Sequence, residues 1–246
     1  MIHYKTFRGF LKMKILFISD IHGNYPALEV LRDYIENADM TICLGDIVGY
    51  HCYVNEVIDF LIKHDVICIQ GNHDRYVFEG VENQQKEIND SVKFGIEIAQ
   101  KELSEDNKDW LSKLPTSFSF KVDNTSFLCC HGSPWDVTNG YVYENSSLFP
   151  KMQDFAFDVI ALGHTHREYT KNLDGLIVFN PGSVGQARDI EGMACAKVFN
   201  TETQGVKTIR ERYDYMSTIN NSIAHGAQEW IYKHFRTLKT IKNDTF

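Results

Sequence analysis

Five short apolar runs of this chain each end in a cluster of Asp, Asn or His residues. The runs and their clusters are KILFIS with Asp20 and His22, TICL with Asp46, VICIQ with Asn72, His73 and Asp74, SFLCC with His131, and VIAL with His164 and His166. Apolar runs of this length are typical of buried β-strands. Because ligands of open α/β sheets bind beyond the carboxyl ends of the strands, we expect all five clusters to converge on one site.

The first half of the chain alternates apolar runs with helical patterns. Helical spacing over residues 25–36 and 54–63 separates the runs KILFIS, MTICL and VICIQ, which predicts a βαβαβ unit with parallel strands and right-handed crossovers. Fully apolar strands indicate a sheet that is covered on both faces. Residues 84–113 are interpreted as two helices, the second of which begins near Ser104 or Asp106 and is stopped by Pro115.

From residue 117 onward strands dominate, which implies a second sheet. The expected strands are SFSFKV, TSFLCC, FDVIAL, REYTKN, GLIVFN, MACAKVFN and VKTIRERY. Apolar residues at helical spacing over 214–235 predict a C-terminal helix. Residues 13–246 are therefore interpreted as one domain of two layered sheets with outer helices. Residues 1–12 lack the apolar stretch of a secretory signal and are set aside as a non-native or disordered leader.

Composition excludes several classes of function. The 246 residues carry a net charge of −8 and no long Lys/Arg block, so we expect no stable binding to a nucleic-acid duplex. No apolar run approaches the roughly 20 residues that a membrane span needs. The six cysteines are scattered and form no C-x-x-C pair, which indicates reduced thiols and a cytoplasmic location.

The clustered side chains are of the types that bind divalent metal ions. Carboxylate, imidazole and amide donors without thiolate suit Mn²⁺, Fe, Zn²⁺, Co²⁺ or Ni²⁺ and disfavour an iron–sulfur cluster or a structural zinc. There are too many donors for one ion. Two ions bridged by one carboxylate would use them all.

The order D-x-H, G-D, G-N-H-D, H and G-H-x-H resembles that of the calcineurin-like metallophosphoesterases, from Met13 to about Tyr213. The resemblance implies a four-layer αββα sandwich, of α/β or α+β class, with two mixed sheets flanked by helices. It also implies two divalent ions per chain. One would be held by Asp20, His22, Asp46 and His166, and the other by Asp46, Asn72, His131 and His164. In the family the residue matching His73 acts on the leaving group and the one matching Asp74 orients it.

The resemblance further implies a reaction and a subgroup. A metal-bridging hydroxide would attack phosphorus in line, while His73 protonates the leaving oxygen. Gly45-Asp46-Ile47 lacks the Asp-Arg-Gly that follows Gly-Asp in the family's protein phosphatases. This segment resembles the corresponding one in the small bacterial and archaeal phosphodiesterases of the family, which use Mn²⁺ or Ni²⁺. The expected function is a phosphodiesterase that acts, with Mn²⁺ as the first choice of metal, on a small phosphate ester such as a nucleotide-like one.

Three other functions remain open: a phosphomonoesterase of the same fold, a non-catalytic scaffold, and a regulatory binder of a signalling nucleotide that it hydrolyses slowly. The candidate substrate contacts are Asn24, Arg75 and Arg188, and the two arginines could instead form structural salt bridges. Tyr50, His51 and Cys52 are expected either to line a pocket or to form a packed loop. Trp135 and Tyr141 are expected either to form an aromatic wall or to pack. The physiological substrate, the oligomeric state and the role of residues 214–246 are not determined by the sequence.

Overall fold

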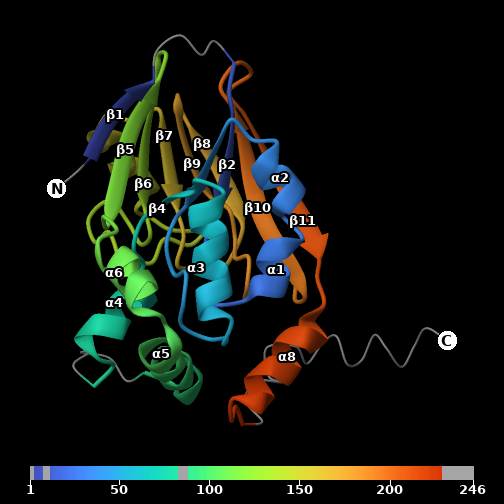
Figure 1. Cartoon of the computed structure of the whole chain (residues 1–246). Helices are drawn as coiled ribbons and strands as arrows, with labels where there is room; N and C mark the ends of the chain where they lie inside the picture. The colour runs from blue at the N-terminus through green and yellow to red at the C-terminus, as the bar shows by residue number, and fades with distance from the viewer. Residues whose placement is uncertain (1–2, 8–11, 83–87, 229–246) are drawn as a thin grey trace, which may run out of the picture.

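The computed structural model of the chain describes residues 3–7, 12–82 and 88–228. Two β-sheets pack against each other in it, and helices cover their outer faces (Figure 1). The strands of the five-stranded sheet are, in spatial order, β11 (Gly205–Arg212), β10 (Met193–Asn200), β2 (Lys14–Ile18), β3 (Met40–Cys43) and β4 (Ile67–Cys68). Those of the six-stranded sheet are β1 (His3–Phe7), β5 (Ser117–Val122), β6 (Thr125–Cys130), β7 (Val159–Leu162), β9 (Leu176–Asn180) and β8 (Tyr169–Leu173). Both sheets are mixed, as predicted.

The helices connect these strands on the outside of the sandwich. They are α1 (Tyr25–Glu29), α2 (Arg32–Glu36), α3 (Val54–Lys63), α4 (Asn72–Glu79), α5 (Asp90–Glu102), α6 (Glu105–Ser112), α7 (Phe149–Met152), the 3₁₀ turn η1 (Gln153–Phe155) and α8 (Tyr215–Ala224). Among the helices of the described ranges, none is long and apolar enough to cross a bilayer.

The βαβαβ unit at the start of the domain is confirmed. Strands β2, β3 and β4 are parallel, and the residues of β3 are all buried, as expected for a sheet covered on both faces. Helix α3 buries Val54, Val57, Ile58 and Leu61, which lie on one face at helical spacing. The parallel arrangement brings the carboxyl ends of the three strands to the same edge of the sheet.

Phenylalanines from both sheets fill the space between them. The ring of Phe17 on β2 lies 4.9 Å from that of Phe179 on β9, and Phe127 on β6 lies 5.2 Å from Phe199 on β10. All four are fully buried. Burying such a side chain contributes roughly 1.5–3 kcal/mol each, so this layer fixes the relative position of the two sheets.

The outer layers differ in thickness. Helices α1 to α3, α5, α6 and α8 contribute to the core on the outer face of the five-stranded sheet. The outer face of the six-stranded sheet is covered by the short α7 and by residues of neighbouring loops such as Val142. The two helices expected within 84–113 are α5 and α6; the side chain of Ser104 caps α6 by accepting from the N–H of Asn107 at 3.2 Å.

The structure corrects two sequence expectations and adds one helix. Strands β10 and β11 do not join the second sheet but return to the first, where β10 pairs antiparallel with β2, Lys197 opposite Phe17. The helix expected over 25–36 is broken into α1 and α2, although no glycine or proline marks the break. Asn72 begins the added helix, α4, which the sequence analysis did not predict. Sheet membership was not predictable because β10 pairs with a strand that lies far away along the chain.

The two ends of the chain are only partly described. Residues 3–7, within the segment set aside as a leader, form the edge strand β1, which pairs in parallel with β5. Helix α8 corresponds to the first part of the helix expected over 214–235, and the positions beyond residue 228 lie outside the described residues.

Candidate metal centre

The seven predicted metal ligands gather at one place, where the strands that precede them end. Two groups share Asp46, and the donor atoms within each lie within 4.8 Å of one another. The first group is Asp20, His22, Asp46 and His166, and the second is Asp46, His131 and His164. All of these side chains are buried. The expected convergence of the five clusters is therefore present in the fold.

In the first group the donor atoms face one another at short distances. Nε2 of His22 lies 3.0 Å from Nε2 of His166, which in turn lies 3.2 Å from Oδ1 of Asp20. Oδ2 of Asp46 lies 3.7 Å from Nε2 of His22. Two imidazole nitrogens and two carboxylate oxygens thus surround a single point.

The second group includes an amide oxygen. Nε2 of His131 lies 3.3 Å from Oδ2 of Asp46, 3.2 Å from Nδ1 of His164 and 3.2 Å from Oδ1 of Asn72. The same oxygen of Asp46 therefore faces both groups. Asn72 supplies the fourth donor, as the resemblance implied.

In the carboxylates of Asp20 and Asp46, one oxygen accepts a hydrogen bond from the backbone and the other faces the metal-binding groups. Oδ2 of Asp20 accepts from the backbone N–H of His164 at 3.1 Å, and Oδ1 of Asp46 accepts from the N–H of His73 at 2.9 Å. The remaining oxygens, Oδ1 of Asp20 and Oδ2 of Asp46, are buried without a hydrogen-bond partner among the described residues. Buried oxygens without a donor are costly unless a cation is bound. This pattern fits the binding of metal ions.

Backbone carbonyls fix the orientation of three imidazoles. Nδ1 of His22 faces the carbonyl of Val48 at 3.2 Å, that of His131 faces Leu44 at 2.8 Å, and that of His166 faces Gln186 at 2.8 Å. A carbonyl only accepts, so Nδ1 carries a proton and Nε2 is the nitrogen left to bind a metal. The sequence analysis identified none of these partners, because a backbone carbonyl has no sequence signature.

The ligands also share an unusual backbone conformation. Five of the seven have positive φ: Asp20, His22, Asp46, His164 and His166. The left-handed region is uncommon for residues other than glycine, and such strain persists only where the surroundings enforce it. Here the N–H of Asp20 donates to Gly45 at 3.0 Å and that of His22 to Asp46 at 2.9 Å. These bonds join the loops after β2 and β3.

Burial and neighbouring charges set the protonation of the centre. Burial lowers the pKa of His22 well below its usual value, with a further contribution from His73. Burial and His131 lower the pKa of His164 to about 3. For Asp46, burial acts to raise the pKa, but His131 and His73 outweigh it and hold the pKa well below the usual range. The centre thus presents neutral His22 and His164 together with an ionised Asp46, the forms that bind metals.

His73 lies beside the centre rather than in it. Its Nε2 is 3.8 Å from Oδ2 of Asp46, and its Nδ1 is buried without a partner among the described residues. Gly49 backs onto the ring, because a Cβ built there would lie 2.2 Å from Nδ1. The ring is therefore held in place chiefly by packing.

Asp74 lies in the first turn of α4 and bonds to backbone groups. Its carboxylate accepts from the backbone N–H groups of Ile47, Val48 and Gly71 at 2.9, 3.1 and 2.9 Å. Burial and the Asp46 carboxylate raise the pKa of Asp74 to about 7, although the N–H groups of Gly71 and Val48 act to lower it. Asp74 thus ties the loop of Asp46 to the start of α4, and its expected role toward His73 stays a prediction.

A cavity of about 310 Å³ opens onto the centre. Of the three candidate substrate contacts, only Arg188 lines it. Asn24 is fully buried and caps α1, and its amide donates to the carbonyl of Gly185 at 2.9 Å. Arg75 donates to Glu79 at 2.5 Å and to Thr138 at 3.1 Å. Asn24 and Arg75 thus have structural partners and do not line this cavity, and their contact with substrate stays a prediction.

The residues expected to line a pocket or form an aromatic wall differ in whether they reach the cavity. Tyr50 and Tyr141 line the cavity, whereas His51 and Cys52 are packed inside the loop at 0% and 5% exposure. Trp135 packs against Phe155 with ring centroids 5.3 Å apart and does not line the cavity. Tyr76, which the sequence analysis did not single out, lines the cavity from α4.

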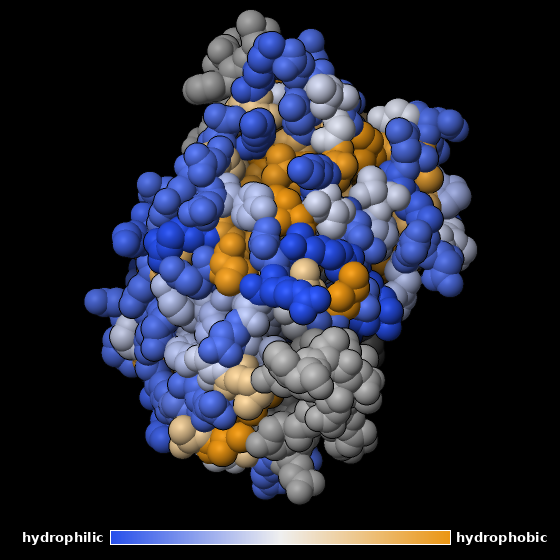
Figure 2. Space-filling model, turned by 90° about the vertical axis from the view of Figure 1, so that its right-hand side faces the viewer, coloured by the Kyte–Doolittle hydropathy of each residue, from blue (hydrophilic) through white to orange (hydrophobic). Residues whose placement is uncertain are grey.

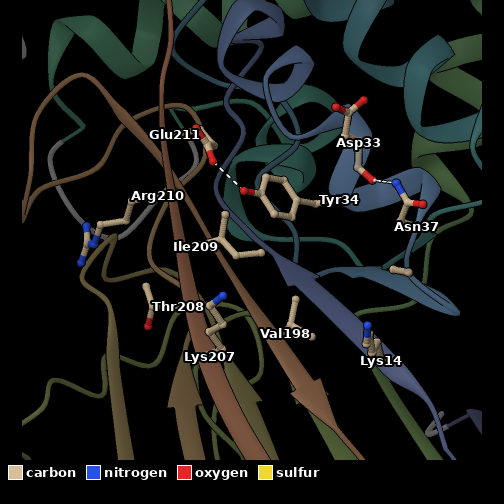
Figure 3. A pocket seen from close by; sticks show the side chains of 11 residues that line it. Lys14, Asp33, Tyr34, Asn37, Val198, Lys207, Thr208, Ile209, Arg210 and Glu211 are labelled. Carbon is tan, nitrogen blue, oxygen red and sulfur yellow. Dashed lines mark hydrogen bonds between the residues drawn. The ribbon is translucent and has the colours of Figure 1, made fainter.

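A second, larger cavity of about 560 Å³ lies elsewhere, between α2 and β11. Figure 2 shows this side of the molecule, where apolar side chains are exposed within a polar surface. Figure 3 shows the lining, in which the hydroxyl of Tyr34 donates to Glu211 at 2.6 Å. Its lining contains none of the residues of the two metal-binding groups. The larger volume therefore does not identify the functional site.

Comparisons with known proteins agree with this geometry. Residues 13–204 match the family model described as the calcineurin-like phosphoesterase superfamily domain. The chain is 27% identical to an uncharacterized protein of Methanocaldococcus jannaschii, over 90% of this chain and 96% of that one. It is 25% identical to a phosphodiesterase of the same organism, over 69% and 83% of the two chains. The crystal structure of a metallophosphoesterase from Sphaerobacter thermophilus superposes with a TM-score of 0.76 at 27% identity, covering 90% of this chain and 97% of that one.

Proposed function

This chain belongs to the calcineurin-like phosphoesterase superfamily, and we propose that it is a phosphodiesterase that hydrolyses a small diester with two divalent metal ions. One observation carries the proposal: Oδ2 of Asp46 is buried without a hydrogen-bond partner among the described residues, between two groups of donor atoms. A shared carboxylate oxygen suits a pair of neighbouring ions better than a single one.

The donor set assigns each ion its ligands. One ion would be held by Asp20, His22, Asp46 and His166, and the other by Asp46, Asn72, His131 and His164. Nitrogen and oxygen donors without thiolate suit Mn²⁺ first, with Fe, Zn²⁺, Ni²⁺ or Co²⁺ as alternatives. When bound, such a pair supplies Lewis-acid activation of water and neutralises charge on phosphate oxygens.

With metal bound, charge would draw a phosphate ester to this cavity. Two divalent ions would contribute +4 and the two aspartates −2, which would leave a centre of +2 in a chain whose formal charge is −8. Arg188 adds a cation at the rim. Its side chain lies beside the hydroxyl of Tyr50, and the adjacent Asp189 pairs with Arg210 at 2.8 Å instead. Arg188 is thus positioned to contact a phosphate oxygen.

His73 is the residue that would protonate the leaving oxygen. Its ring borders the cavity, and its Nε2 faces the centre, 3.8 Å from Oδ2 of Asp46. Burial lowers the pKa of His73, although the Asp46 carboxylate counteracts this. An anionic phosphate bound beside the ring would raise the pKa again and favour the acid form when substrate is present.

The absence of an arginine directly after Gly45-Asp46 supports specificity for a diester. Gly45-Asp46-Ile47 contains no arginine that would balance the second negative charge of a monoester. The similarity to a chain named phosphodiesterase also favours a diester.

The test compares two chromogenic esters with the Mn²⁺-loaded full chain. We expect kcat/KM for bis(p-nitrophenyl) phosphate to exceed that for p-nitrophenyl phosphate. A tenfold or larger preference for the monoester would instead identify a phosphomonoesterase. Failure to hydrolyse either ester, with fewer than about one ion bound per chain, would favour a scaffold.

The cysteines support a reducing location. All six are free and buried. We propose the cytoplasm on this basis, since oxidising compartments favour disulfide formation.

A further inference from the structure

Three tyrosines line the cavity next to the groups that carry the chemistry. The ring of Tyr50 lies 5.0 Å from that of His73, and the ring of Tyr76 lies 5.7 Å from it. Tyr141 lies beside the other metal group, with its ring 3.9 Å from that of His164. Aromatic side chains therefore border the cavity both at His73 and at His164.

Two of these rings have surface left to offer a ligand. Tyr50 is only 4% exposed because it packs against His22 and His73. Tyr141 is 44% exposed and Tyr76 is half-buried.

Two apolar side chains also line the cavity. They are Val92 on α5 and Ile88, just before that helix. A volume of about 310 Å³ is at the lower end of the range for small-molecule sites, roughly 300–1,000 Å³. The cavity therefore accommodates a substrate of about mononucleotide size rather than a folded protein.

We propose that Tyr76 and Tyr141 are specificity-determining residues that stack on a planar aromatic ring, such as a nucleobase, in one ester group of the phosphodiester. The inference rests on the proposed function, because it places the phosphate at the metal centre and the aromatic ester group against the tyrosines. Arg188, also at the rim, would contact the phosphate between them. Stacking of this kind recognises a flat π-surface and tolerates differences in base identity.

The experiment uses three diesters that share p-nitrophenolate as leaving group. Their second ester group is thymidine 5′-yl, benzyl or cyclohexylmethyl. The last two match in size and in the alkyl character of the ester oxygen, so their ratio isolates the contribution of a planar ring. The Mn²⁺-loaded full chain is compared with Tyr76→Leu, Tyr141→Leu and the conservative Tyr76→Phe and Tyr141→Phe.

A matched control is available in the second cavity. Tyr34 is 38% exposed and lines the cavity between α2 and β11, where it bonds to Glu211 (Figure 3). Tyr34→Leu removes a similarly exposed ring from a site that contains none of the metal-binding groups. It should leave all three values of kcat/KM unchanged.

For the wild type we expect kcat/KM for the thymidine and benzyl esters to exceed that for the cyclohexylmethyl ester by about tenfold, a factor typical of base–aromatic stacking. Each Leu variant should lower this ratio markedly, and each Phe variant should retain it because the ring is kept. Equal hydrolysis of the three esters by the wild type would overturn the inference and leave the proposed function intact. So would an unchanged ratio in both Leu variants. Hydrolysis of none of them would contradict the proposed function itself.

Discussion

The backbone N–H of His73 donates to Oδ1 of Asp46 across 2.9 Å, so the residue proposed as the acid also fixes the carboxylate shared by both metal groups. His73 lies in the first turn of α4, where the backbone N–H groups have no acceptor within the helix. It leaves Oδ2 of Asp46 directed at both donor groups. Any change at one of the two residues must therefore be checked for an effect on the other.

Replacing the shared carboxylate tests the two-ion assignment. Asp46→Asn keeps an oxygen that can accept from His73 but removes the charge and one donor oxygen. We expect the Mn²⁺ bound per chain to fall from two to below about one, because the remaining donors lose their common anion. Metal analysis after gel filtration measures this. Asp33→Asn, at an exposed position on α2, is the control and should keep both ions. Two ions in Asp46→Asn would refute the bridging role.

Removing the imidazole of His73 separates protonation from metal binding. His73→Ala keeps the backbone N–H that holds Asp46, so the metal content should not change. We expect kcat to fall by about 10²–10⁴ for a diester with an alkoxide leaving group. The loss should be much smaller with p-nitrophenolate, which departs without a proton. Equal losses for both leaving groups, or near-wild-type turnover for both, would remove His73 from the role of acid.

Gly49 tests whether packing positions the His73 ring. A Cβ at Gly49, where φ is +129°, would lie 2.2 Å from Nδ1 of His73. Gly49→Ala should therefore lower kcat roughly tenfold to a hundredfold through displacement of the ring, without loss of metal. Gly175→Ala is the matched control, since its φ is +99° but no atom lies within 4 Å of the added Cβ. Both variants should lose stability, and a similar loss of activity in both would contradict the positioning role.

The ion pair of Asp189 and Arg210 predicts a pH-dependent stability. Burial acts to raise the pKa of Asp189, but Arg210 and the backbone N–H groups of Ile190 and Glu168 together outweigh it and lower the pKa below 3.8. A lowered pKa in the folded state adds stability above the unfolded value, and this contribution disappears as the pH falls through the folded value. We expect Asp189→Asn to lower the free energy of unfolding by about 1 kcal/mol at pH 7.

Urea denaturation between pH 7 and pH 3.5 measures the difference in the free energy of unfolding between the wild type and Asp189→Asn. This difference should shrink as the pH falls below about 3.8. Asp154→Asn, at an exposed position in η1, should show little difference at any pH. A difference for Asp189→Asn that grows as the pH falls would contradict the assignment.

Much of the fold and the site was predictable because strong local signals coincide with the elements. Apolar runs marked the strands, and the polar residues after them marked the place where Asp20, Asp46 and His131 meet. The side chain of Ser104 caps α6, as its position before a helical pattern suggested.

Other features depend on contacts that no local pattern records. The return of β10 to the first sheet depends on pairing with a strand nearly two hundred residues earlier. The left-handed backbone of Asp20 and His22 is imposed by bonds to the loop of Asp46, and residue type alone does not predict it. Asn24 and Arg75 were assigned to substrate by type, but their bonds to Gly185 and Glu79 are structural.

The central claim is that Asp46 joins two metal sites in one centre. Anomalous diffraction at the manganese edge, from crystals of the Mn²⁺-loaded chain, tests it most directly. The account predicts two peaks, one among Asp20, His22 and His166 and one among Asn72, His131 and His164, with Asp46 between them. A single peak, or manganese bound only elsewhere, would contradict it.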